Sequence, residues 1–268
     1  MQVLFNELSL TGQFTDLDTF LKKELLLFVG VLKEIQKFST LLLKKEDVWE
    51  KMITPTRNLH SVLVNNTYRT TDEVRRLKLA LVELTKEPFC ESERKQKTDS
   101  TYLFDGVDIL GSSLAEACER DKVVVSFVSS STSLDPLNII RNGKVVPLLN
   151  LTHSGKFTER LWATNQISFE LYLKARFSSG KLDFSKVDEK LGFVGIQKDD
   201  QSLFLDTFRK FEELTWDQIR SDNGLDYKEY QGIVSSRYQG IKTYKFRASQ
   251  KIRCHGFRDR NTFIVIGF

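Results

Sequence analysis

The residues best suited to chemistry lie near the end of the chain. A window of 24 residues there contains one acid, Asp259, and eight basic residues: Arg237, Lys242, Lys245, Arg247, Lys251, Arg253, Arg258 and Arg260. Two sets in it recur at every second position, namely Lys245 with Arg247, and Lys251 with Arg253 and His255. Because side chains alternate between the two faces of a strand, each set would share one face of a sheet.

A sheet face of this composition suits a phosphodiester as its ligand. Lys and Arg would neutralise backbone phosphates and the negative charge that develops when a phosphodiester is cleaved. His255 could transfer a proton near neutral pH. The segment has no cluster of carboxylates, so we expect chemistry without a metal or other cofactor. The competing interpretation is a solvated sheet face whose cations keep an edge strand soluble.

The stretch from Tyr244 to Arg253, followed by Gly256 and the apolar run 262–266, resembles the core of the RelE/ParE-type toxin superfamily. Upstream, the segment 208–219 resembles the helix that precedes the sheet in those proteins. The resemblance covers roughly residues 181–268. It implies helices followed by an antiparallel meander. RelE-like members cleave mRNA, usually on the ribosome and without a metal, whereas ParE-like members inhibit gyrase and are not nucleases.

The resemblance also implies roles for individual residues. Arg247 and Arg253 match the basic strand positions of the ribonuclease branch, with Lys245 and Lys251 as supporting cations. His255 matches no position of that pattern, and we assign it as a candidate acid or base. The predicted nucleic-acid-binding set is Lys242, Lys245, Lys251, Arg258 and Arg260. Related proteins usually continue past the last strand with residues that complete the site, a position that this sequence does not reach.

Several elements must position these residues. Strands are predicted at 242–247, 251–257 and 262–268, with a tight turn at 258–261, because apolar and basic residues alternate there. Pairing of the first two strands through 248–250 would turn Tyr244, Phe246, Ile252 and Cys254 into a core. Helices are predicted before them at 168–177 and 201–220, the second of which ends at Asn223-Gly224.

The first part of the chain shows a mixed pattern. We predict a strand at 3–10, helices at 15–43, 46–52, 71–86 and 113–121, and a strand at 123–127. Asn142-Gly143 between two apolar arms predicts a hairpin within 138–149. The fold class is therefore α+β in two domains. Residues 1–163 would form a mixed helical domain with a small sheet and a regulatory or recognition role, and residues 164–268 a RelE-like domain.

Length and composition agree with two folded domains. The chain has 268 residues, of which 40% are hydrophobic and 11% aromatic, enough to form cores and too apolar for a disordered chain. The net charge is +4, yet the basic window alone carries +7, so the remainder sums to −3. We therefore expect an acidic N-terminal domain that could cover the basic residues and keep them inactive.

The remaining candidates for chemistry are weaker. Cys90, Cys118 and Cys254 are odd in number and widely spaced, which favours reduced thiols in the cytoplasm over a disulfide framework or a zinc site. His60 and His153 have no metal-type partners nearby in sequence. The longest apolar run covers eight residues, too few to cross a bilayer, and the N-terminus lacks signal-peptide features. We expect a cytoplasmic protein without a membrane partner.

These observations lead to one hypothesis and two alternatives. The hypothesis is a toxin-like, metal-independent endoribonuclease that acts on RNA or the ribosome in a toxin–antitoxin or phage-defence setting. A protein inhibitor or a defence-complex subunit would be its second partner. One alternative is a non-catalytic nucleic-acid-binding or protein-interaction module that uses the same basic residues. The other is a gyrase-directed toxin.

Overall fold

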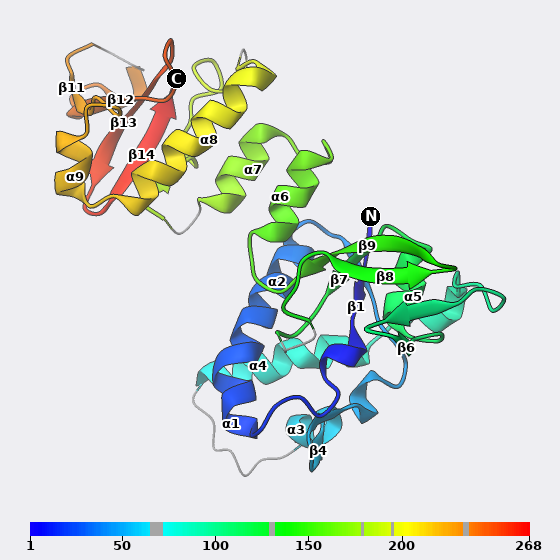
Figure 1. Ribbon diagram of the computed structural model, residues 1–268. Coiled ribbons are helices and arrows are strands. Elements are labelled where there is room, and N and C mark those ends of the chain that lie inside the picture. Colours follow the sequence, from blue (N-terminus) through cyan, green and yellow to red (C-terminus); the bar gives the residue numbers. More distant parts are fainter. Residues whose placement is uncertain (65–71, 129–131, 178–179, 194–195, 233–235) are drawn as a thin grey trace. The chain divides into compact units, whose positions relative to one another are not determined.

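The chain folds into two compact units, Met1–Phe157 and Thr158–Phe268. The computed structural model describes residues 1–64, 72–128, 132–177, 180–193, 196–232 and 236–268 (Figure 1). The division falls inside α6 (Lys156–Ala163), slightly before the boundary predicted at residue 163. Each unit combines helices with a sheet, as the mixed sequence pattern predicts. No helix in the described ranges is both long enough and apolar enough to cross a membrane.

The first unit is organised around one large sheet. Its described residues form seven strands in the order β2-β1-β7-β9-β8-β5-β6. The parallel half consists of β2 (Leu41–Leu43), β1 (Gln2–Phe5), β7 (Val123–Val125) and β9 (Lys144–Leu151). The antiparallel half consists of β8 (Leu137–Arg141), β5 (Tyr102–Phe104) and β6 (Val107–Asp108). The sheet is thus larger than the small sheet expected from the sequence.

Helices pack against this sheet around an aromatic core. They are α1 (Leu17–Thr19), α2 (Leu25–Lys37), α3 (Leu59–Val64), α4 (Asp72–Val82) and α5 (Ser113–Cys118). A separate hairpin consists of β3 (Met52–Thr54) and β4 (Arg57–Asn58). Phe127, just after β7, stacks on Phe28 of α2 with ring centroids 4.1 Å apart, and Phe5 of β1 packs edge-on against both rings. These rings join the first helices to the sheet.

Two predicted helices of this unit are wrong in extent or type. The first ends at Lys37 instead of continuing to Leu43, because Ser39 adopts a left-handed backbone (φ 49°) and Leu41–Leu43 pair with β1. Instead of a helix at 46–52, the chain forms a short 3₁₀ turn at Val48–Glu50 and then β3. Short apolar runs do not distinguish a buried strand from a buried helix by periodicity alone.

Other predictions for this unit are confirmed in full or in part. The β8–β9 hairpin turns at Asn142 and Gly143, whose φ values of 47° and 75° are those of a type I′ turn. The predicted helix 71–86 is α4 continued by a 3₁₀ turn at Glu83–Thr85, and residue 71 lies outside the described residues. The strand predicted at 3–10 is shorter, because β1 ends at Phe5 and a 3₁₀ turn follows.

The second unit is a helical layer against a smaller sheet. Its helices are α6, α7 (Phe169–Arg176), α8 (Lys198–Glu213) and α9 (Trp216–Ser221). Its sheet has the order β10 (Leu182–Asp183), β14 (Thr262–Gly267), β13 (Arg253–Asp259), β12 (Thr243–Arg247) and β11 (Lys228–Tyr230). The strands β11 to β14 form an antiparallel meander, and β10 pairs in parallel with β14. The predicted meander of three C-terminal strands is confirmed, but β13 runs from Arg253 to Asp259 and not over 251–257, so the predicted turn at 258–261 is shorter.

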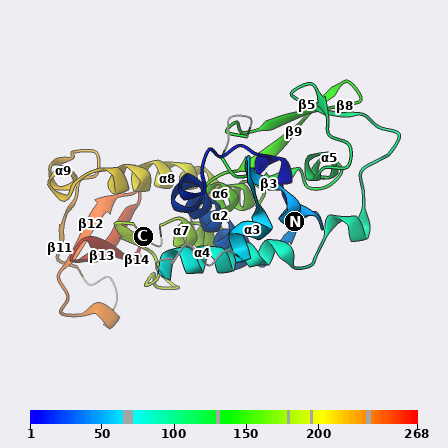
Figure 2. The same ribbon diagram turned by 90° about the horizontal axis from the view of Figure 1, so that it is seen from below.

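One face of this sheet is sealed by helices. Figure 2 shows α8 and α9 on one side of β12, β13 and β14. The ring of Phe246 on β12 lies 4.6 Å from that of Phe211 and 6.1 Å from that of Phe208, both on α8. These three side chains are fully buried. Because residues alternate along β12, the neighbours of Phe246 must point to the opposite face.

The single helix predicted at 201–220 is in fact two helices. Between them, Thr215 acts as the N-cap of α9: its hydroxyl accepts a hydrogen bond from the backbone N–H of Gln218 at 3.3 Å. The Gln218 side chain in return accepts one from the backbone N–H of Thr215 at 2.8 Å. The Thr-Trp-Asp-Gln sequence of this capping box is the local signal for the break, although the apolar pattern runs through it.

Candidate nucleic-acid interface

The pairing of β12 with β13 brings four of the predicted residues together on one face. Lys245 lies opposite His255, and Arg247 lies opposite Arg253. Residues that face each other across antiparallel strands point to the same side, so we call Lys245, Arg247, Arg253 and His255 the basic face. The intervening pair, Phe246 and Cys254, is fully buried against the helices. The predicted separation of cations and core residues is confirmed.

The cations of the basic face are not neutralised by acids. Within the described residues, no ion pair joins Lys245, Arg247 or Arg253 to a carboxylate, whereas other cations of this sheet do form such pairs. The Lys245 ammonium lies 5.1 Å from the ring centroid of Tyr230, in a cation–π contact. The Arg253 guanidinium donates weakly to the carbonyl oxygens of Ser249 and Gln250 in the β12–β13 turn. The face therefore retains its positive charge.

His255 lies half-buried among these cations. Burial lowers its pKa below the usual 6.5, and the charges of Lys245 and Arg253 lower it further. Its ring packs edge-on against Tyr230, with centroids 4.6 Å apart. Its Nδ1 is buried and has no hydrogen-bond partner among the described residues. A neutral imidazole is favoured, and only its Nε2 is left to meet a ligand.

The edge strand β11 supplies neighbours that the sequence argument missed. Lys228 lies opposite Lys245, and Tyr230 follows two positions later on the same side. Asp226, just before β11, pairs with Lys228 at 3.0 Å. This pair lowers the pKa of Asp226, and the more distant charges of Arg247 and Arg253 act in the same direction. The period-two spacing of Lys228 and Tyr230 is a signal that could have revealed this strand.

The other predicted cations lie elsewhere. Lys242 forms an ion pair with Glu229 at 2.8 Å, and its ammonium lies 5.8 Å from the ring centroid of Tyr244. Arg258 stacks on Trp216 of α9, 3.9 Å from the ring centroid, and so lies on the helix-covered side. The sequence spacing predicts Lys251 within a strand. In the structure it is exposed in the turn before β13. Arg260 is exposed in the β13–β14 turn with φ 52°.

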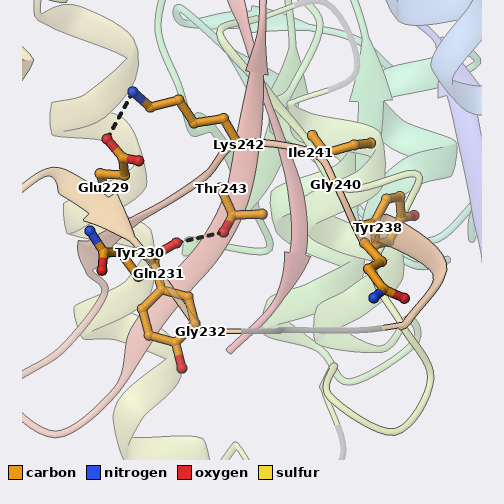
Figure 3. Close-up of a pocket in the computed structure, with 10 residues that line it drawn as sticks. Glu229, Tyr230, Gln231, Gly232, Tyr238, Gly240, Ile241, Lys242 and Thr243 are labelled. Carbon is orange, nitrogen blue, oxygen red and sulfur yellow. Dashed lines mark hydrogen bonds and ion pairs between the residues drawn. The ribbon is translucent and has the colours of Figure 1, made fainter.

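A cavity of about 450 Å³ adjoins the edge of the sheet where β11 meets β12. Figure 3 shows the Lys242–Glu229 pair there, together with the hydrogen bond of 3.0 Å that the Thr243 hydroxyl donates to the Tyr230 carbonyl oxygen. Tyr230 thus lines this cavity and also contacts the basic face.

The charge distribution contradicts the acidic N-terminal domain expected from the whole-chain sum. Residues 1–157 contain 21 Lys and Arg and 21 Asp and Glu, so the first unit has no net charge. The acidic excess lies instead in residues 158–236, with 14 acids against 11 basic residues. The second unit is therefore polarised within itself, and the first has no acidic excess with which to cover the basic face.

The described residues contain no group of three or more His, Cys, Asp or Glu side chains arranged to hold a metal ion. Comparisons of the chain with family models, with curated proteins and with solved structures found no match. Function must therefore be inferred from the chain's own residues and geometry.

Proposed function

We propose that the second unit binds RNA on the basic face and cleaves it as a metal-independent endoribonuclease. The observation that carries this proposal is the register of β12 and β13, which sets three cations without carboxylate partners around one half-buried histidine. Cations without ion pairs can take up phosphates without first breaking an internal contact. Groups that are already in place cost no reorganisation when charge develops in the reaction.

The same four residues can divide the steps of cleavage among them. Neutral His255 accepts the proton of a ribose 2′-hydroxyl at Nε2, and the 2′-oxygen attacks the adjacent phosphorus. The bond from phosphorus to the 5′-oxygen breaks, and this oxygen takes a proton from solvent. The products are a 2′,3′-cyclic phosphate and a 5′-hydroxyl. Arg247 and Arg253 stabilise the charge on the phosphorane oxygens, and Lys245 neutralises the neighbouring phosphate.

The lowered pKa of His255 supports the role of base. An imidazole with a pKa below 6.5 is largely unprotonated at neutral pH and is ready to accept a proton. Burial of Nδ1 directs that proton to Nε2. The cations around His255 also make its protonated form a stronger acid, which favours release of the proton after the reaction.

The test is cleavage of RNA by the full chain in EDTA, alone and with ribosomes, with the ends identified by mass spectrometry. We expect fragments that end in 2′,3′-cyclic phosphate. Arg247→Ala with Arg253→Ala should abolish them, while the matched pair Lys242→Ala with Glu229→Ala should not. Absence of fragments from the unsubstituted chain, or fragments that persist in the Arg247/Arg253 variant, would overturn the proposal.

A toxin–antitoxin or phage-defence setting with a protein inhibitor rests on the resemblance of residues 181–268 alone. Growth arrest on expression that requires Arg247 and Arg253 would support that setting. RNA binding without fragments would instead identify a non-catalytic module, and DNA-damage signalling without fragments a gyrase-directed toxin.

A further inference from the structure

A second cavity, of about 460 Å³, lies between α8 and the β12–β13 turn. Its α8 wall carries Asp200 and Asp206, with the half-exposed side chain of Leu203 between them. Its other wall carries Arg247 and Lys251. Both walls belong to the second unit. The volume is in the range of about 300–1,000 Å³ that is typical of sites for small organic groups.

The charges on the two walls oppose each other without pairing. Within the described ranges, no ion pair joins Asp200 or Asp206 to Arg247 or Lys251 across the cavity, and Asp206 pairs only within its own helix, with Arg209 at 3.7 Å. The helix dipole stabilises an acid in the first turn of α8, which explains the presence of Asp200. It does not explain Asp206, which lies in a later turn. The cavity thus offers acceptors on one wall and cations on the other.

Arg247 connects this cavity to the basic face. It lines the cavity and also lies opposite Arg253 in the sheet register. A phosphate held by Arg247 would therefore have an attached nucleoside within reach of the α8 wall. A group in the cavity would then meet carboxylate acceptors and an apolar side chain.

We infer that this cavity binds a guanine base of the RNA, next to the phosphate held by Arg247. This inference rests on the proposed function. Guanine presents two adjacent donors, N1–H and the N2 amino group, on its Watson–Crick edge, which a carboxylate can accept together. Uracil has one donor on that edge, and adenine and cytosine each have one amino group. Single-stranded RNA is commonly read along this edge. A carboxylate of the α8 wall, from Asp200 or Asp206, would therefore select guanine.

The test compares binding of uncleavable oligonucleotides by fluorescence anisotropy. The probes are 2′-O-methyl heptamers of uridine with a single central guanine, inosine, adenine or cytosine, which lack the 2′-hydroxyl needed for cleavage. We expect the guanine probe to bind roughly tenfold more tightly than all-uridine, as one bidentate base contact allows. Inosine lacks the N2 amino group and should lose most of this gain.

Each variant is assessed by the ratio of its affinity for the guanine probe to its affinity for the all-uridine probe. The ratio is needed because removal of any acid strengthens RNA binding generally. Asp200→Asn with Asp206→Asn should bring that ratio close to one. The control is Asp199→Asn, which removes one carboxylate in the same helical turn as Asp200, at an exposed residue that does not line the cavity. It should keep the ratio of the unsubstituted chain.

The outcomes separate this inference from the proposed function. Salt-dependent binding of every probe with no guanine preference would overturn the guanine site and leave RNA binding on the basic face intact. A preference for cytosine or adenine, equal binding of inosine and guanine, or a preference that survives in the double variant would also overturn the site. Failure of all probes to bind would overturn both.

Discussion

The charge of the basic face predicts how RNA binding depends on salt. Lys245, Arg247 and Arg253 have no carboxylate partner in the described structure, so each can replace a counterion on a phosphate. On single-stranded nucleic acid, each phosphate neutralised adds about 0.7 to the slope of log affinity against log salt. Three contacts then contribute a slope of about 2, or roughly a 20-fold loss of affinity between 50 and 200 mM salt.

Substitution of these residues by Gln should remove that contribution stepwise. Anisotropy titrations of a 2′-O-methyl uridine oligonucleotide at several KCl concentrations should give a slope smaller by about 0.7 for each single variant and by about 2 for the triple variant. The control is Lys242→Gln with Glu229→Gln, which removes both charges of an existing ion pair and should leave the slope unchanged. An unchanged slope in the triple variant would refute the assignment of the basic face, as would an equal loss in the control.

Three further predictions concern the same sheet. If Lys245→Gln is made, the acidic limb of the pH–rate profile for cleavage should move to higher pH, because a cation that lowers the pKa of His255 is removed; a limb that stays in place would argue against His255 as the base. Phe246→Ala should lower the free energy of unfolding of the second unit by about 3–5 kcal/mol in urea titrations, since the ring is fully buried against α8, and a loss below about 1 kcal/mol would contradict that packing. Gly256→Ala should destabilise the same unit by about 1–3 kcal/mol, because the added methyl group would collide with the Ile264 carbonyl oxygen and the Phe263 ring; Gly30→Ala, where the methyl group has room in α2, should leave the second unit unchanged and be neutral or slightly stabilising for the first unit.

Local patterns of the sequence were enough to predict the core of the candidate site. The alternation of basic and apolar residues along 242–247 and 251–257 predicts two strands with cations on one face and Phe246 and Cys254 on the other. The structure confirms this arrangement. Alternation is a property of a single strand, so it can be read without knowing what the strand packs against. The Asn142-Gly143 turn was predictable for a similar reason, because its backbone angles favour those two residues.

Contacts between distant segments were not predictable in this way. Leu41–Leu43 form a strand because β1 is available to pair with them, and an apolar triplet carries no sign of that partner. Ion pairing of Lys242 with Glu229 and stacking of Arg258 on Trp216 likewise depend on where β11 and α9 are placed. The cations of one window of sequence are therefore divided by the fold between an open face, an ion pair, a helix-covered side and exposed turns.

The sequence by itself determined that basic residues would share a strand face and that helices would precede the sheet. The tertiary structure decided which of those cations keep a free charge, which aromatic ring packs against His255, and which acids lie across a cavity from Arg247. The reason is physical: strand alternation and turn preferences arise within a few residues, whereas neutralisation of a charge and burial of a ring depend on groups that only folding brings together.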